Sequence, residues 1–176
     1  MLTDSALYTI LAAALNLSPS AAAAQKMIRA AYQPADPSPE PSRADDLLYY
    51  HLAPDPAARP LPEESVQSGN TRTAIRYLPY RLTLTFYGPD AERNALLVRT
   101  RLYQDGKGNP LSLLRAQNAY PVPCPPAPAV LFEPAAARWR KRADLTVSLR
   151  IAEEASLPSG PSVAVAPRVT VWRNGS

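Results

Sequence analysis

Residues 77–104 constrain the fold more than any other part of the sequence, because a period-2 segment runs there directly into an amphipathic helix. Leu82, Leu84 and Phe86 alternate with polar residues, the pattern of a strand with one buried face. After the turn, apolar residues at helical spacing form a single stripe: Ala91, Ala95, Val98 and Leu102. The sequence therefore predicts a strand–helix unit that packs against a core, and none of its side chains is an obvious catalyst.

The turn inside this unit contains Gly88, Pro89 and Asp90. Proline is favoured at the first helical position, because the N–H that it lacks has no partner there. We therefore expect Gly88 to be the N-cap and Pro89 to be the first helical residue. Asp90 and Glu92 would then lie where the helix dipole favours negative charge.

The N-terminal apolar run predicts a helix over residues 4–17, capped by Thr3 or Asp4. A secretory leader begins with positive residues, whereas this N-terminus carries Asp4 and no Lys or Arg. The run is also too short to span a bilayer. We interpret it as a helix of a cytoplasmic protein rather than a signal peptide.

Alternating or apolar segments elsewhere predict three further strands. They cover residues 47–52, 143–152 and 163–172. Two segments stay ambiguous: residues 21–31 fit either a helix or an extended exit, and residues 111–116 fit either a short helix or a strand.

Proline is an outlier in the composition, with 21 prolines against 6 glycines, which is about twice the usual proline frequency. The prolines concentrate in residues 34–62 and 121–134, where they indicate loops and extended connections rather than helix interiors. Residues 54–70 predict a long polar loop, and loops of such length are usually functional or ordered only on binding.

The predicted order of elements is helix, strand, strand, helix, strand, strand. It indicates a single α+β domain over residues 1–176, with an antiparallel or mixed sheet of about four strands, helices packed on one face and long Pro-rich loops. The open edges of such a sheet have to be covered, and a ring of subunits is one way to cover them.

The sequence offers no convincing catalytic or metal site. The only histidine, His51, lies in an apolar strand without a nucleophile motif, so we interpret it as an ordinary strand residue. The chain has a single cysteine, Cys124, so it cannot form an intrachain disulfide. Cys124 lies among prolines, and we interpret it as a loop residue. Acidic residues occur as adjacent pairs that do not converge on one cation: Asp45 and Asp46, Glu63 and Glu64, Glu153 and Glu154. We therefore expect no catalytic residues, no cofactor, no metal and no enzyme activity.

The strongest binding feature is a basic cluster that surrounds a tryptophan. This basic cluster comprises Arg138, Trp139, Arg140, Lys141 and Arg142. Cations neutralise phosphates and tryptophan stacks on bases, so the cluster could bind nucleic acid. The chain carries a net charge of only +4 and its other basic residues are scattered, which favours a solvated or subunit-facing patch.

Two groups of motifs resemble a known family. Residues 87–91 read Tyr-Gly-Pro-Asp-Ala and residues 94–99 read Asn-Ala-Leu-Leu-Val-Arg; further on, the Pro-rich segment from Tyr120 leads through residues 131–133 to a strand with Trp139. Together they resemble the neck or tail-terminator proteins of tailed bacteriophages. The resemblance extends over about residues 70–172.

The resemblance implies a structural virion protein that caps the tail tube as a ring, with a hexamer matching the tube, and joins the tail to head-completion proteins. Genome DNA would pass through the lumen without sequence recognition. The implied location is the virion neck or tail, after assembly in the host cytoplasm, with no membrane contact. The alternative is a nucleic-acid-binding accessory protein that uses residues 138–142.

We expect the interface to involve residues 54–70, the proline segment 121–128 and the basic cluster. The candidate interface residues are Arg138, Trp139, Arg140, Lys141, Arg142, Glu63, Glu64 and Arg72.

Overall fold

The computed structural model describes residues 2–31, 44–57, 63–68, 71–106, 108–123, 127–135 and 138–158. This part of the chain forms four helices and a seven-stranded sheet. The helices are α1 (Asp4–Ala14), α2 (Ala22–Met27), α3 (Ala91–Tyr103) and α4 (Pro110–Ala116). The strands are β1 (Ile28–Ala30), β2 (Leu47–Pro54), β3 (Glu63–Ser68), β4 (Thr71–Tyr87), β5 (Ala119–Pro121), β6 (Ala129–Ala135) and β7 (Arg138–Pro158).

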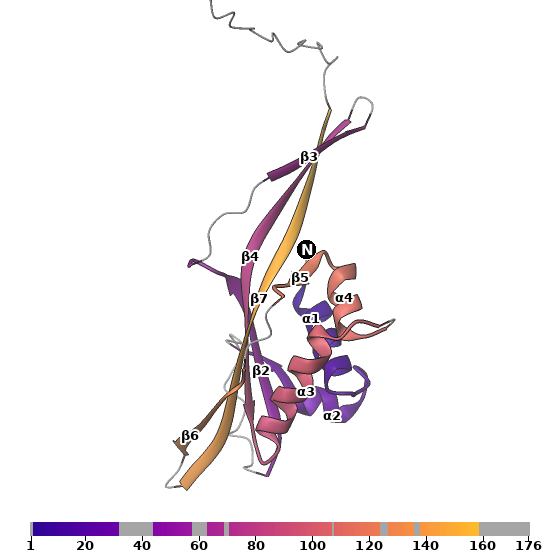
Figure 1. Cartoon of the computed structure of the whole chain (residues 1–176). Coiled ribbons are helices and arrows are strands. Elements are labelled where there is room, and N and C mark those ends of the chain that lie inside the picture. Colours follow the sequence, from indigo (N-terminus) through magenta and orange to yellow (C-terminus); the bar gives the residue numbers. More distant parts are fainter. Residues whose placement is uncertain are drawn as a thin grey trace, which may run out of the picture.

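The sheet is mixed and is built around two long antiparallel strands. Its order is β1-β2-β4-β7-β5, with β3 paired to β4 and β6 paired to β7; only the β1–β2 pair is parallel among the described strands. In Figure 1, β4 and β7 form a long twisted ribbon, and the helices pack on one face of it. The predicted α+β class is confirmed, although the sheet has seven strands rather than about four in the described part of the chain.

Both long strands extend well past the ranges that the sequence predicts. β4 begins at Thr71 rather than near residue 77, and β7 covers residues 138–158 rather than 143–152. The apolar alternation stops where the helices stop covering the sheet: Ile151 is buried, whereas Glu153 is exposed. Burial therefore marks only the middle of each strand, and hydrogen bonding to a neighbour continues beyond it.

The prediction of a long loop over residues 54–70 is wrong. β2 extends to Pro54, and β3 forms a hairpin with β4 in which Glu63 lies opposite Arg76 and Ser68 lies opposite Thr71. β3 lacks apolar alternation because its backbone pairs with β4 at the uncovered end of the ribbon, where no core faces it. In Figure 1, β3 lies at one end of the ribbon and β6 at the other.

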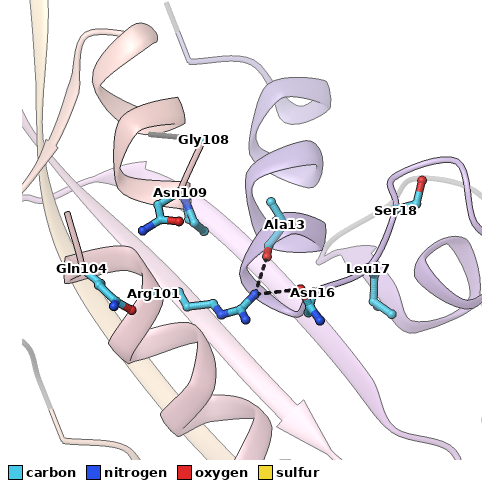
Figure 2. A pocket seen from close by; sticks show the side chains of 9 residues that line it. Ala13, Asn16, Leu17, Ser18, Arg101, Gln104, Gly108 and Asn109 are labelled. Atoms are coloured by element: carbon cyan, nitrogen blue, oxygen red, sulfur yellow. Dashed lines mark hydrogen bonds between the residues drawn. The ribbon is translucent and has the colours of Figure 1, made fainter. Parts of the chain in front are cut away.

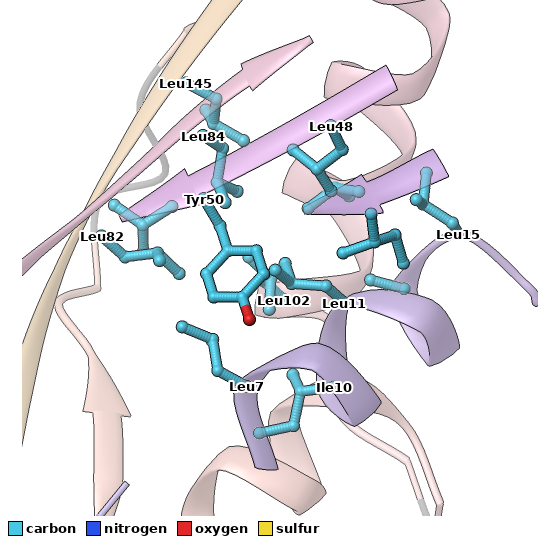
Figure 3. Close-up of a cluster of buried hydrophobic side chains, with 14 of the residues drawn as sticks. Leu7, Ile10, Leu11, Leu15, Leu48, Tyr50, Leu82, Leu84, Leu102 and Leu145 are labelled. Carbon is cyan, nitrogen blue, oxygen red and sulfur yellow. The ribbon is translucent and has the colours of Figure 1, made fainter. Parts of the chain in front are cut away.

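The core lies between the sheet and helices α1 and α3. Figure 3 shows Leu7 and Leu11 of α1 close to the apolar side chains of the central strands. The side chains that the alternation assigns to the buried faces of β4 and β7 are all buried: Leu82, Leu84, Phe86, Leu145, Val147 and Leu149. The predicted register of both strands is confirmed.

Helix α1 begins as predicted and ends early. The Thr3 hydroxyl accepts a hydrogen bond from the Ala6 N–H at 3.2 Å, so Thr3 is the N-cap. Asn16 then adopts a φ of 62°, and the N–H of Leu17 returns to the carbonyl of Ala12 at 2.9 Å. This C-terminal capping motif ends the helix at Ala14 rather than at residue 17.

The segments that the sequence left ambiguous are resolved. Residues 21–31 contain both alternatives, helix α2 followed directly by strand β1, and residues 111–116 belong to helix α4. The predicted strand over residues 163–172 and the loop residue Cys124 lie outside the described residues.

The start of α3 differs from the prediction. Asp90, not Gly88, is the N-cap, and the helix begins at Ala91, so Pro89 precedes it. A contact distant in sequence sets this turn, since the Asp90 N–H donates to Asp46 Oδ1 at 3.0 Å. The buried stripe itself is as predicted: Ala91, Ala95, Val98 and Leu102.

Gly88→Ala should destabilise the protein by roughly 2–3 kcal/mol, because Gly88 combines a positive φ with a close approach of the chain. Its φ is +110°, and a Cβ would overlap Asp46 Oδ1 and lie 2.8 Å from the carbonyl oxygen of Asp45. Gly108→Ala is the matched control: its φ is +78°, but a Cβ would meet nothing within 4 Å, so backbone strain alone should cost about 1 kcal/mol. Urea unfolding compares them, and equal losses would show that the turn around Gly88 gives way easily.

Candidate functional site

The basic cluster lies on the part of β7 that pairs with β6, at one end of the ribbon. Successive strand residues point to opposite faces. Ala143 and Leu145 are buried on the helix-covered face, so Arg140 and Arg142 belong to the opposite face, which we call the outer face. Trp139 is on the helix side but beyond the helices, and its side chain is 71% exposed.

Carboxylates already neutralise two members of the basic cluster. Lys141 Nζ lies 2.8 Å from Glu92 Oε2. The Nε and Nη2 of Arg142 donate to the two oxygens of Asp144, both at 2.8 Å, and its Nη1 lies 3.2 Å from Glu133 Oε2. The hydrogen bonds to Asp144 are the main reason that the pKa of Arg142 is raised. Little of this positive charge is left for phosphates.

Arg140 differs from its neighbours. The residue is only 9% exposed, and its guanidinium stacks on the ring of Tyr87 at 4.3 Å from the ring centre. Its Nε and Nη2 are buried without a hydrogen-bond partner in the described structure. Among the described side chains of the basic cluster, the guanidinium of Arg140 is therefore the positive group to which no carboxylate is bound. The side chain of Arg138 is outside the described part.

A surface hollow of about 340 Å³ surrounds this guanidinium on the outer face. It is lined by Tyr49, Thr85, Tyr87, Glu133, Arg140 and Arg142. Burial raises the pKa of the Tyr87 hydroxyl, and the carboxylate of Glu133 raises it further. The hollow is thus a polar, cation-containing site with aromatic walls, suited to binding an anion.

The other candidate interface residues lie at the opposite end of the ribbon, in the hairpin of β3 and β4 (Figure 1). Glu64 is exposed, and Arg72 Nη2 donates to Ser65 Oγ at 3.2 Å. Glu63 pairs in register with Arg76, and its side chain is not described. One chain therefore does not bring all the candidate residues together; it places them in two groups at the two ends of a ribbon.

An exposed apolar surface beside the basic cluster was not predicted. Val130 and Phe132 of β6, 39% and 64% exposed, are on the helix side with Trp139, whereas Leu131, 47% exposed, is on the outer face opposite Arg142. Three consecutive apolar residues after a proline segment were the available signal. Within the described residues β6 pairs only with β7, so its other edge is open. Exposed apolar side chains on an open edge strand are typical of an interaction surface.

The structure gives the locations and contacts of three side chains that were considered for catalysis or metal binding. His51 is exposed on β2. Asp45 pairs with Lys26 at 3.1 Å, and Asp46 anchors the turn before α3; burial raises the pKa of Asp46, although its hydrogen bond from Asp90 opposes this. Over the described ranges no three His, Cys, Asp or Glu side chains are grouped to hold a metal ion.

A second hollow, of about 550 Å³, lies between α1, α3 and α4. Figure 2 shows the residues that line it. Arg101 Nη1 reaches across it to the carbonyl of Ala13 at 3.1 Å and to Asn16 Oδ1 at 3.3 Å. A cation at the end of α1 is favoured by the helix dipole. The hollow thus contains a structural contact between α1 and α3.

Arg101→Ala should destabilise the protein by about 1.5 kcal/mol, because it removes charged hydrogen bonds from the last turn of α1. Arg93→Ala, on the same helix, is the control. The Arg93 side chain is 81% exposed, and its ion pair with Asp90 is long, at 3.9 Å. Its removal should therefore cost less than about 0.5 kcal/mol. Urea unfolding of both variants measures the difference, and similar losses would show that the α1–α3 contact contributes nothing.

In the described part of the chain no helix has the length and apolar character that crossing a membrane requires. The extended ribbon, its open strand edges and its exposed apolar and charged ends are features of a structural protein that acts through contacts with other chains. A family model for phage neck terminator proteins matches residues 5–169. The chain therefore belongs to the phage neck terminator protein family, a family of structural proteins of the phage neck, and the resemblance seen in the sequence is confirmed. No curated protein matches the sequence significantly.

Proposed function

We propose that this chain forms a ring that caps the tail tube and joins the tail to the head-completion proteins. The main support is the β4–β7 ribbon, which extends beyond the helices toward β3 at one end and toward β6 at the other (Figure 1). Two different binding surfaces at opposite ends of one subunit are what a head-to-tail contact requires, and such contacts form a ring when the rotation between subunits closes.

We infer a homohexamer, by similarity to tail terminators whose rings match the symmetry of the tube. The subunit is a single domain over residues 1–176, assembled in the host cytoplasm and then held in the virion neck or tail. Its interfaces include the basic cluster at one end of the ribbon and Glu63, Glu64 and Arg72 at the other. Genome DNA passes through the lumen without sequence recognition.

Nucleic-acid recognition by residues 138–142 has less support. Glu92 neutralises Lys141, and Asp144 and Glu133 neutralise Arg142. A protein that binds DNA through its backbone needs several free cations along one surface. A gel shift at increasing salt tests this alternative, and we expect weak retention at most.

The test of the proposed function removes the hairpin end of the ribbon in the phage. Glu63 lies directly opposite Arg76, so deleting residues 63–76 removes β3 together with the part of β4 that pairs with it. The core is on the other part of β4 and β7, and the purified variant should therefore unfold cooperatively. Electron microscopy of lysates should show filled heads separate from tails, and some overlong tails.

Phage carrying Arg93→Ala, an exposed substitution on α3, is the control and should give joined virions. Joined virions that carry the hairpin deletion would remove this hairpin from the joint. A chain that is absent from purified virions and tails would remove the terminator function itself.

A further inference from the structure

Arg140 holds a buried cation whose best hydrogen-bonding edge is unused. Its Nε and Nη2 have no partner among the described residues, and the residue is only 9% exposed. Leaving such donors unpaired in a buried place is unfavourable, so native proteins rarely retain them without a reason. Stacking on Tyr87 holds the guanidinium but does not satisfy these two N–H groups.

The geometry indicates which ligand would satisfy Arg140. Nε and Nη2 form one edge of the planar guanidinium, which matches the two oxygens of a carboxylate. Two residues along the same strand, Arg142 uses this same pair of nitrogens to bind both oxygens of Asp144. Glu133, the acidic residue opposite Arg140 on β6, is paired with Arg142 instead. Among the described residues, no carboxylate is therefore bound to Arg140.

The other end of the ribbon carries exposed carboxylates. Glu64 of β3 and Glu154 of β7 flank Ile75 of β4 in one row across three strands. On the opposite face the equivalent row places Arg76 opposite Glu153. Glu64 and Glu154 are exposed, and neither forms an ion pair within the described residues.

Arg140 and Glu154 point to the same face of β7, because they are fourteen positions apart, an even number. Fourteen residue steps along a strand cover about 46 Å, so Arg140 cannot bind Glu154 of its own chain. A second copy can bring its Glu154 to this Arg140, and its own Arg140 is then free for a third copy. This repeated head-to-tail contact is the type that builds closed rings.

We propose that Arg140 binds the carboxylate of Glu154 from a second copy of this chain, in the hollow lined by Tyr49, Thr85 and Tyr87. Both buried nitrogens then donate to one carboxylate. Leu131 of β6 is opposite Arg142 on the outer face, so it lies beside the contact and is covered with it. The contact rests on the proposed ring for its biological setting, and it is tested in the purified chain.

The experiment measures self-association of the full chain by analytical ultracentrifugation over increasing protein concentration. The wild-type chain should associate as concentration rises. Arg140→Glu and Glu154→Arg should each weaken association by roughly thirtyfold or more, as expected when one partner of a desolvated ion pair is removed. The double variant Arg140→Glu/Glu154→Arg should regain most of the wild-type affinity, because it restores the pair with reversed charges.

Two further variants separate the ion pair from other effects. Arg140→Lys keeps the positive charge but lacks the flat edge with two donors, so it should also weaken association. Arg150→Glu reverses an exposed charge on the same face of β7 between the two ends, and it should leave association unchanged. Thermal unfolding of each variant shows whether it is folded.

Three results would overturn the proposal: a wild-type chain that stays monomeric up to its solubility limit, single reversals without effect, or a double variant that does not recover. A DNA result would overturn it too, if Arg140→Glu removed salt-dependent retention of duplex DNA and left sedimentation unchanged. If the charge-reversed double variant failed to associate, while the phage still needed this chain to join heads and tails, the proposed ion pair would be wrong and the proposed function would stand. Absence of the chain from virions would instead remove the terminator function.

Discussion

Val147→Asp should destabilise the protein by about 4 kcal/mol, enough to unfold much of the population at room temperature. Val147 is 0% exposed on the helix-covered face of β7, in register with the equally buried Leu82 of β4. An aspartate there either buries an unpaired carboxylate or takes up a proton, and both are unfavourable in an apolar core. Chemical denaturation followed by circular dichroism measures the loss.

Thr146→Asp is the matched control, because it places the same side chain one residue earlier on the same strand. Thr146 is exposed on the outer face opposite Thr83. Its carboxylate stays in water, so we expect a change within about 0.5 kcal/mol. If the two substitutions had equal effects, the assignment of the faces of β7 would be wrong.

The sequence predicts the elements that pack on the core, because burial imposes a period on them. Leu82 to Phe86 and Leu145 to Leu149 alternate since one face of the sheet is covered by α1 and α3. The hairpin of β3 has no such requirement. Its strand pairs through backbone hydrogen bonds while its side chains stay polar, and the sequence therefore resembles a loop.

The start of α3 shows a different limit. Gly88 and Pro89 fit a local rule for helix starts, but Asp46, more than forty residues earlier, accepts the Asp90 N–H and sets the turn. No local pattern around Pro89 contains that contact. Helix boundaries are often decided in this way by tertiary partners.

For the candidate interface, the sequence predicts which residues are charged but not which partners they have. The sequence shows the positive charges of residues 138–142, but their state depends on neighbours that the fold supplies. Asp144 is near in sequence, whereas Glu133 reaches Arg142 only through the pairing of β6 with β7, which was not predicted. That pairing also decides that Arg140, rather than Arg142, is left without a carboxylate.

Ala95→Pro should cost about 3 kcal/mol or more, because it acts on the middle of α3. Proline removes a backbone hydrogen bond inside the helix, and its ring collides with the preceding turn. Ala95 is also 0% exposed in the stripe that faces the sheet, so the larger ring has no free space. We expect a lower helix signal in circular dichroism together with an earlier denaturation midpoint.

Pro89→Ala provides the comparison, since it changes a proline that lies outside α3. The structure begins the helix at Ala91 with Asp90 as the N-cap, so Pro89 is exposed in the turn and blocks no helical hydrogen bond. Its replacement should change the free energy of unfolding by less than about 1 kcal/mol, mostly through added freedom of the unfolded chain. A folded Ala95→Pro protein with unchanged helix content would contradict the position of α3, and with it the side of the sheet on which the core lies.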